Sequence, residues 1–146
     1  MSATLHAPTD SAPVQRQESA LLVEARRPAR RAALAHRLIA RILLGALAIQ
    51  LFFAGLGVFG LATFQMHIVL GTAIVLGSFA LPVLAWRGRL DRGTTRLSWL
   101  LAGLMMLQGA LIDVGRVVPV VSAFHPVNAM LLILVTFTLA GRDASF

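Results

Sequence analysis

The sequence contains no cysteine, and this absence excludes several kinds of chemistry at once. A chain without thiols forms no disulfide, has no thiolate nucleophile and offers no cysteine ligand to an iron–sulfur cluster. It also lacks the C-x-x-C-H pattern that attaches haem covalently, so any haem must be held without a covalent bond to the protein. Hydrolase chemistry is equally unsupported, because no serine or carboxylate in the apolar runs has a base partner.

Lysine is absent as well. All 13 basic residues are arginine, and the net charge is +7. A sequence pI near 11.9 raises the question of nucleic-acid binding, but the chain carries no recognition module. Twelve arginines lie in the N-terminal segment, in the link 87–96 or at Arg142, next to apolar runs, where attraction to anionic lipid headgroups explains them. We therefore expect a lipid bilayer as partner and no nucleic acid.

Apolar length is what the sequence has in abundance. Of the 146 residues, 58% are hydrophobic, and the mean hydropathy is +0.80, too high for an ordinary soluble domain. Four runs reach or approach the length of about 20 residues that a helix needs to cross a hydrocarbon core. Short arginine-rich loops stay on the cytoplasmic side, so both termini and the middle link are predicted to face the cytoplasm. The predicted spans are residues 42–63, 67–86, 97–114 and 124–141.

Short links between the runs make sequence neighbours antiparallel neighbours in space. The sequence therefore predicts an all-α membrane protein, an up-down-up-down bundle of four transmembrane helices, over residues 38–142. Residues 1–24 lack a sustained apolar period, and residues 1–37 are predicted to form a disordered basic cytoplasmic tail and juxtamembrane segment, with His36 solvated among the headgroups. The first run is expected to be a retained helix rather than an export signal.

Two histidines open apolar runs, His67 the second and His125 the fourth. In an up-down bundle the second and fourth helices run in the same direction on diagonal corners, so the two side chains reach the same depth. Gly71 lies one turn after His67, and Asn128 one turn after His125. Strongly polar side chains inside a membrane usually face the bundle interior and mark function. These residues therefore form the candidate site.

Neutral imidazoles that face each other across a bundle core are a natural pair of axial ligands for haem iron. The second nitrogen of each ring needs an acceptor, for which Gln65, a backbone carbonyl and water are the candidates. Glycines in the spans indicate either close helix packing or room for a flat cofactor. Pro126 supports an alternative without metal, because a residue before proline disfavours the helical conformation and His125 would then cap the helix. Gln50 and Gln108 are the other polar groups deep in the spans, and interhelical hydrogen bonding is their simpler interpretation.

The segments QLFFAGLGVFG, HIVLG, LQGAL and FHPVNAMLL resemble a family of small, largely uncharacterised bacterial four-helix membrane proteins, over roughly residues 50–142. Their order is also distantly similar to one four-helix half of heme A synthase. The resemblance implies that His67 and His125 are axial ligands of haem b and that Gln50, Gln108 and Asn128 lie near the pocket. A single four-helix unit implies haem binding without haem oxygenation. The resemblance places the chain in the bacterial cytoplasmic (inner) membrane as a multi-pass protein.

The leading hypothesis is thus a small b-type cytochrome that transfers single electrons near the outer face, with quinone, a larger redox complex or a second copy of the chain as candidate partners. The alternative is a haem-free structural or accessory subunit of a larger membrane complex. A small transporter is less well supported, since the sequence has no inverted repeat, interrupted helix or buried acidic relay. Asp113 and Arg116 are expected to form an interfacial ion pair, with a proton or quinone contact as the alternative.

Overall fold

The computed structural model describes residues 12–142, and within this range all regular structure is helical. Four of its segments are long and apolar enough to cross a membrane, which confirms the prediction of an all-α chain with four spanning helices. These segments are Glu24–Val58, Gln65–Arg87, Arg92–Gly115 and Pro119–Gly141. The helices are α1 (Ala12–Val58), α2 (Gln65–Ser78), α3 (Ala80–Arg87), α4 (Arg92–Gly115), the short 3-10 helix η1 (Pro119–Ala123) and α5 (Phe124–Gly141).

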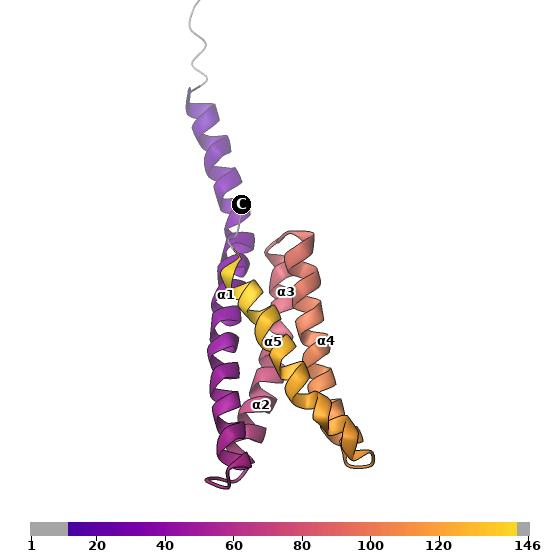
Figure 1. Ribbon diagram of the computed structural model, residues 1–146. Helices are drawn as coiled ribbons and strands as arrows, with labels where there is room; N and C mark the ends of the chain where they lie inside the picture. The colour runs from indigo at the N-terminus through magenta and orange to yellow at the C-terminus, as the bar shows by residue number, and fades with distance from the viewer. Residues whose placement is uncertain (1–11, 143–146) are drawn as a thin grey trace, which may run out of the picture.

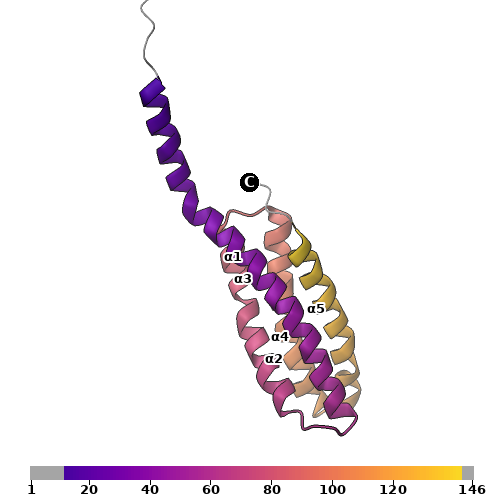
Figure 2. The same cartoon turned by 90° about the vertical axis from the view of Figure 1, so that its left-hand side faces the viewer.

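Spans that follow one another along the chain lie side by side, and α2 and α3 lie end to end within the second span (Figures 1 and 2). α1 packs against α2, α3 and α5, and α4 packs against α3 and α5, so α2 and α5 occupy diagonal corners. The bundle is closed near the α3–α4 link. Toward its other end α1 and α2 diverge from α4 and α5 (Figure 1). The buried core includes Ala40, Leu81, Leu101, Leu132 and Leu139.

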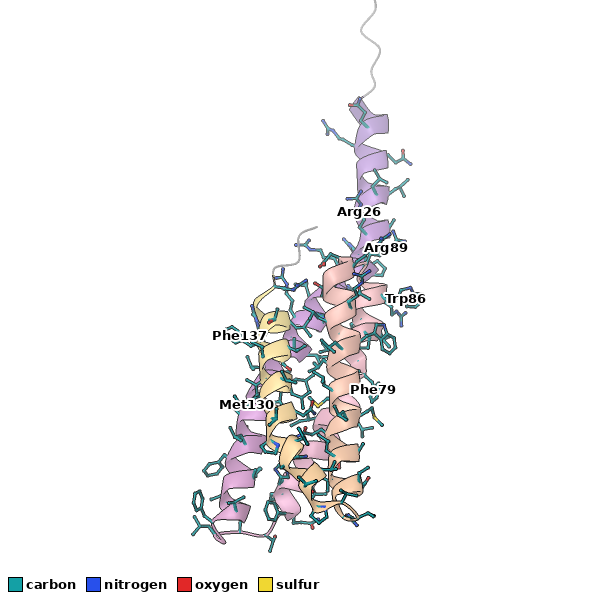
Figure 3. All side chains as sticks on the ribbon, turned by 45° about the vertical axis from the view of Figure 1, so that its right-hand side comes forward. Arg26, Phe79, Trp86, Arg89, Met130 and Phe137 are labelled. Carbon is teal, nitrogen blue, oxygen red and sulfur yellow. The ribbon has the colours of Figure 1, made fainter. Side chains whose placement is uncertain are left out.

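The outside of the bundle is apolar. Phe79, Trp86, Met130 and Phe137 point away from the helix axes in Figure 3, and Trp86 is 77% exposed. Large apolar side chains on the surface of all four spans are suited to contact with lipid rather than water. The polar side chains inside the bundle are therefore the informative ones, because lipid offers them no hydrogen bonds.

The N-terminal part of α1 differs from the prediction. Residues 1–37 were expected to be a disordered tail and juxtamembrane segment, but α1 is helical from Ala12 and continues through Pro28. The alanine, arginine and leucine residues of this segment are strong helix formers, which explains the difference. Packing against the bundle begins at Ala33, before the predicted domain boundary of residue 38. Residues 1–11 of the predicted tail lie outside the described part of the chain.

His36 is buried, so the prediction that it is solvated is wrong. Its side chain is 1% exposed, and its Nε2 lies 2.9 Å from the Oγ of Ser98 on α4. The Ser98 hydroxyl donates to the backbone carbonyl of Thr94, at 2.8 Å. Since that hydroxyl has only one proton, the His36 Nε2–H must donate to Ser98. This contact joins α1 to α4 at the closed end of the bundle.

The second span is interrupted, contrary to the prediction of an uninterrupted helix. α2 ends at Ser78 and α3 begins at Ala80. Pro82 explains the break, because proline has no N–H and its ring clashes with the carbonyl four residues earlier, here that of Ser78. At the same position the Ser78 hydroxyl donates a hydrogen bond to the backbone carbonyl of Val75. The interruption separates α2, which lines the divergent end, from α3, which belongs to the closed end.

Asp91 caps the N-terminus of α4 in the link after α3. Its carboxylate accepts hydrogen bonds from the hydroxyl and the backbone N–H of Thr94. Arg142, just after α5, lies 3.5 Å from the same carboxylate and donates to the Thr94 hydroxyl at 3.1 Å. The end of α5 is thereby held beside the α3–α4 link.

We expect the stability of the bundle to fall at acid pH through Asp91. The hydrogen bonds from the Thr94 hydroxyl and backbone hold the pKa of Asp91 below its ordinary value of 3.8. A lowered pKa means that this stabilisation is present above the ordinary value and is lost as the pH falls through the folded-state pKa. Melting temperatures in detergent between pH 7 and pH 3 measure the effect. Asp91→Ala removes the cap, at a cost of about 1 kcal/mol of folding free energy at pH 7. The melting temperature of this variant should depend less on acid pH than that of the wild type. An equal dependence in both proteins would contradict the role of Asp91.

Candidate functional site

His67 and His125 both lie in the first turn of a helix. α2 begins at Gln65, two residues before His67, and α5 begins at Phe124, one residue before His125. The capping residue of α5 is Ala123, so the alternative in which His125 is the N-cap is wrong. Proline is tolerated in a first helical turn, where the backbone N–H groups have no intrahelical partner, and Pro126 fits there.

A reciprocal pair of hydrogen bonds fixes His67 against α1. The Nδ1 of His67 lies 3.1 Å from the backbone carbonyl oxygen of Gln50, and the side-chain amide of Gln50 donates to the backbone carbonyl of His67 at 2.7 Å. Gln50 thus makes two hydrogen bonds to His67, one through its main-chain carbonyl and one through its side-chain amide. Both the ring and the start of α2 are held by the same residue.

The same arrangement occurs between α4 and α5. The Nδ1 of His125 lies 3.1 Å from the backbone carbonyl oxygen of Gln108, and the Gln108 amide donates to the backbone carbonyl of His125, also at 3.1 Å. In both pairs the glutamine precedes the histidine by 17 residues. Of the acceptors considered for the rings, the backbone carbonyl is the one found.

The two pairs belong to an internal repeat with an offset of 58 residues. The offset relates Gln50 to Gln108 and His67 to His125, and it also relates many buried positions on each side. Gly57 lies against Phe64 as Gly115 lies against Ser122. The chain therefore contains two similar helical hairpins that face each other. Other related pairs, buried in both hairpins, are Leu43 with Leu101, Leu47 with Met105, Ile74 with Leu132, Ser78 with Thr136, and Leu81 with Leu139.

The hydrogen bonds define the protonation of both rings. A carbonyl oxygen only accepts, so each Nδ1 must carry the proton, and in the neutral ring the lone pair is then on Nε2. The ring centroids of His67 and His125 lie 6.3 Å apart, with 56° between the ring planes. Two imidazoles that bind one metal from opposite sides have centroids roughly 6 Å apart, because each bond is ~2 Å long and the ring centre lies about 1 Å behind the nitrogen.

A cavity of about 520 Å³ lies between the hairpins, at the divergent end of the bundle. This volume is within the range of about 300–1,000 Å³ that is usual for small-molecule sites. Apolar residues from all four spans supply most of the wall, and polar groups enter it from both hairpins. Five of the six predicted site residues line the cavity: Gln50, His67, Gly71, Gln108 and His125.

Asn128 lies behind the wall rather than on it. It is 4% exposed, and its amide nitrogen donates to the backbone carbonyl of Leu104 and to the side-chain oxygen of Gln108. It therefore orients Gln108, which in turn holds His125. The side-chain oxygens of Asn128 and Gln50 are buried without a donor in the described part of the chain. Such acceptors cost about 1–3 kcal/mol when unsatisfied, so a donor from water or a ligand is expected beside them.

Gly71 provides the space for the Gln50 amide. A Cβ at position 71 would lie 2.7 Å from the Nε2 of Gln50, too close for the hydrogen bond to His67 to keep its geometry. A Cβ added at Gly55, Gly103 or Gly109 would have no neighbouring helix within 4 Å. Close helix packing therefore does not explain these three glycines. Gly109 lines the same cavity as Gly71. The small residues that matter for the site are thus those that keep the cavity open.

The residues present fit haem better than a bare metal ion. No group of three or more metal-binding side chains occurs in residues 12–142. A porphyrin supplies four nitrogen ligands of its own, so two imidazoles with free Nε2 atoms complete the coordination of its iron. The centroid separation of 6.3 Å and the mostly apolar cavity agree with this ligand set.

The predicted ion pair between Asp113 and Arg116, at the C-terminal end of α4, is confirmed. The Nε of Arg116 lies 3.9 Å from a carboxylate oxygen of Asp113, and both side chains are more than three-quarters exposed. Both residues line the mouth of the cavity that contains the histidines. An ion pair so exposed contributes ~0–1 kcal/mol to stability.

Comparison with known proteins gives one match. Residues 50–115, under half of the chain, match a family described as a family of unknown function (DUF6220). The matched segment includes Gln50, His67 and Gln108 and ends before His125. No curated protein and no solved structure matches the chain. The chain is thus similar, from Gln50 in α1 to the end of α4, to an uncharacterised family, and the likeness to heme A synthase stays a hypothesis.

Proposed function

We propose that the chain is a small b-type cytochrome in which His67 and His125 together bind one haem b. One observation carries the proposal. Two histidines line the wall of one cavity, each with its Nδ1–H directed to a backbone carbonyl, and their ring centroids lie 6.3 Å apart. Bound haem supplies reversible one-electron chemistry. The function is then single-electron transfer, rather than the work of a stand-alone enzyme.

In this proposal the chain's own residues position and shield the cofactor. The backbone carbonyls of Gln50 and Gln108 hold the rings and keep the lone pairs on Nε2. The apolar wall, formed in part by Leu47, Met105 and Leu132, limits access of water to the cavity. Outer hydrogen-bond partners of metal-binding histidines typically change metal affinity by roughly 10–100-fold when removed.

We further propose that the bundle crosses the bacterial cytoplasmic membrane with both termini inside. Arg142 and the α3–α4 link lie together at the closed end, whereas Arg116 lies at the divergent end. The histidines are then near the outer face, and quinone or a larger redox complex is the candidate electron partner, with a second copy of the chain as candidate oligomer.

The orientation predicts the compartment of each link. Reporter fusions after Arg92 and Arg142 should report the cytoplasm, and a fusion after Val118 should report the exterior, because twelve of the thirteen arginines lie on the first side. Paired alkaline phosphatase and fluorescent-protein reporters measure the two compartments. An inverted pattern would place the histidines on the cytoplasmic side and contradict the orientation.

The cytochrome proposal is tested by the absorption spectrum of protein expressed with ample haem and purified in detergent. A Soret band, sharp α and β bands on reduction and about one haem per chain are the expected result. Absence of a Soret band would overturn the proposal. The haem-free accessory subunit would then be the better interpretation, with the glutamines and histidines acting as interhelical hydrogen-bond partners.

A further inference from the structure

Arg116 is isolated from the other arginines of the sequence. The remaining twelve lie between Arg16 and Arg41 of α1, in the link 87–96 or at Arg142. Arg116 follows directly after α4, and it lines the same cavity as His67 and His125. The site therefore combines two histidines in an apolar cavity with one cation at its mouth.

The internal repeat shows that this cation is not part of the shared packing of the hairpins. The offset of 58 residues relates Arg116 to Val58 and Asp113 to Gly55, so the other hairpin has no charge at either position. The related glutamines, histidines and core residues are similar in both hairpins. Arg116 is thus the charged group that distinguishes the two sides of the site, beside Asn128, which the same offset relates to Leu70.

The guanidinium of Arg116 is only weakly engaged by the protein. Its contact with Asp113 is a single Nε approach of 3.9 Å between exposed side chains, and it has no other ion pair within residues 12–142. A guanidinium offers five N–H donors in a plane and binds carboxylates through two parallel hydrogen bonds. Most of that capacity is available to a ligand at the cavity mouth, where Asp113 is the competing carboxylate.

We propose that Arg116 binds the carboxylate edge of the ligand in the cavity, which for haem is its propionate groups. The inference rests on the proposed function, since the carboxylates belong to haem. An apolar macrocycle then lies between the histidines and its acidic edge reaches the outer membrane surface. Arg116 fixes which way the ligand faces in a histidine pair that alone does not distinguish the two directions.

The experiment compares haem with a haem whose two carboxylates are methyl esters. Both are titrated into detergent-purified, haem-depleted wild type, Arg116→Gln and Arg96→Gln. Arg96 lies near the start of α4, whereas Arg116 directly follows its end. We expect Arg116→Gln to weaken haem binding by roughly 3- to 10-fold, the range of a partly exposed charge pair, and to leave binding of the diester unchanged. Arg96→Gln should change neither. Asp113→Asn should tighten haem binding, because it removes the competing carboxylate.

Each other outcome is informative. Equal weakening of haem and diester by Arg116→Gln would mean that Arg116 supports the end of α4 and not a carboxylate, and would overturn the inference. Unchanged haem binding in Arg116→Gln, with wild type binding haem, would overturn the inference and leave the cytochrome proposal in place. A wild type that binds neither porphyrin would overturn the cytochrome proposal itself.

Discussion

Replacing His67 or His125 with alanine is expected to abolish the low-spin spectrum of the haem-loaded protein. In the proposed site each substitution removes one of the two histidine ligands of haem, so the iron should become high-spin or haem should be lost. The affinity for haem should fall by more than roughly 100-fold, since even an outer hydrogen-bond partner is worth 10–100-fold. Because the two hairpins hold the rings in the same way, the two single variants should behave alike.

Added imidazole makes this test specific for ligation. In His67→Gly or His125→Gly the space of the ring is open to a free imidazole, which should restore the low-spin spectrum in proportion to its concentration. His36→Ala is the matched control. Its ring is bonded to Ser98 at the closed end, so this variant should melt at a lower temperature and keep the normal spectrum of bound haem. A low-spin spectrum that survives in His67→Ala would refute ligation by that residue.

The spanning helices and most of the site were predictable from sequence because membranes impose simple rules. The length of each apolar run can be counted directly in the sequence, and a polar side chain in a span must find a hydrogen-bond partner inside the bundle. His67, His125, Gln50 and Gln108 are such side chains, and all four line the cavity. Asn128 was also placed near the pocket, and it lies one hydrogen bond behind the wall.

The acceptors of the histidine rings were not predictable from side chains. They are main-chain carbonyls, which every residue carries and no sequence pattern marks. A signal was nevertheless present, since Gln50 and His67 are separated by the same 17 residues as Gln108 and His125. Comparing the sequence with itself at an offset of 58 residues would have shown the two hairpins and the pairing of each glutamine with a histidine.

His36 shows where local composition misleads. Its neighbours Arg37 and Arg41 indicate a headgroup environment, whereas its burial depends on Ser98, 62 residues away. The break after α2 is the opposite case, because Pro82 marks it locally. Apolar length alone did not reveal that break. The burial of His36 was not predictable because its partner is distant in the sequence, whereas the break after α2 was predictable from Pro82.

Leucine at position 71 is expected to eliminate haem binding while leaving the bundle folded. Gly71 lines the cavity one turn after His67, so a leucine side chain there occupies the space beside the ring. The new Cβ also displaces the Gln50 amide, which costs one interhelical hydrogen bond of about 0.6 kcal/mol. Filling part of an apolar cavity offsets that loss, so the melting temperature of the haem-free form should change little.

Gly103→Leu is the matched control, because Gly103 has nothing within 4 Å of its Cβ position and does not line the cavity. It should bind haem like the wild type. Ala129, related to Gly71 by the repeat, lines the opposite wall, and Ala129→Leu should exclude haem from that side. Haem content per chain and the melting temperature of each variant are measured together. If Gly71→Leu keeps its haem, the cavity is not the binding site. If the haem-free form instead unfolds many degrees lower, Gly71 serves helix packing, as an accessory subunit without cofactor requires.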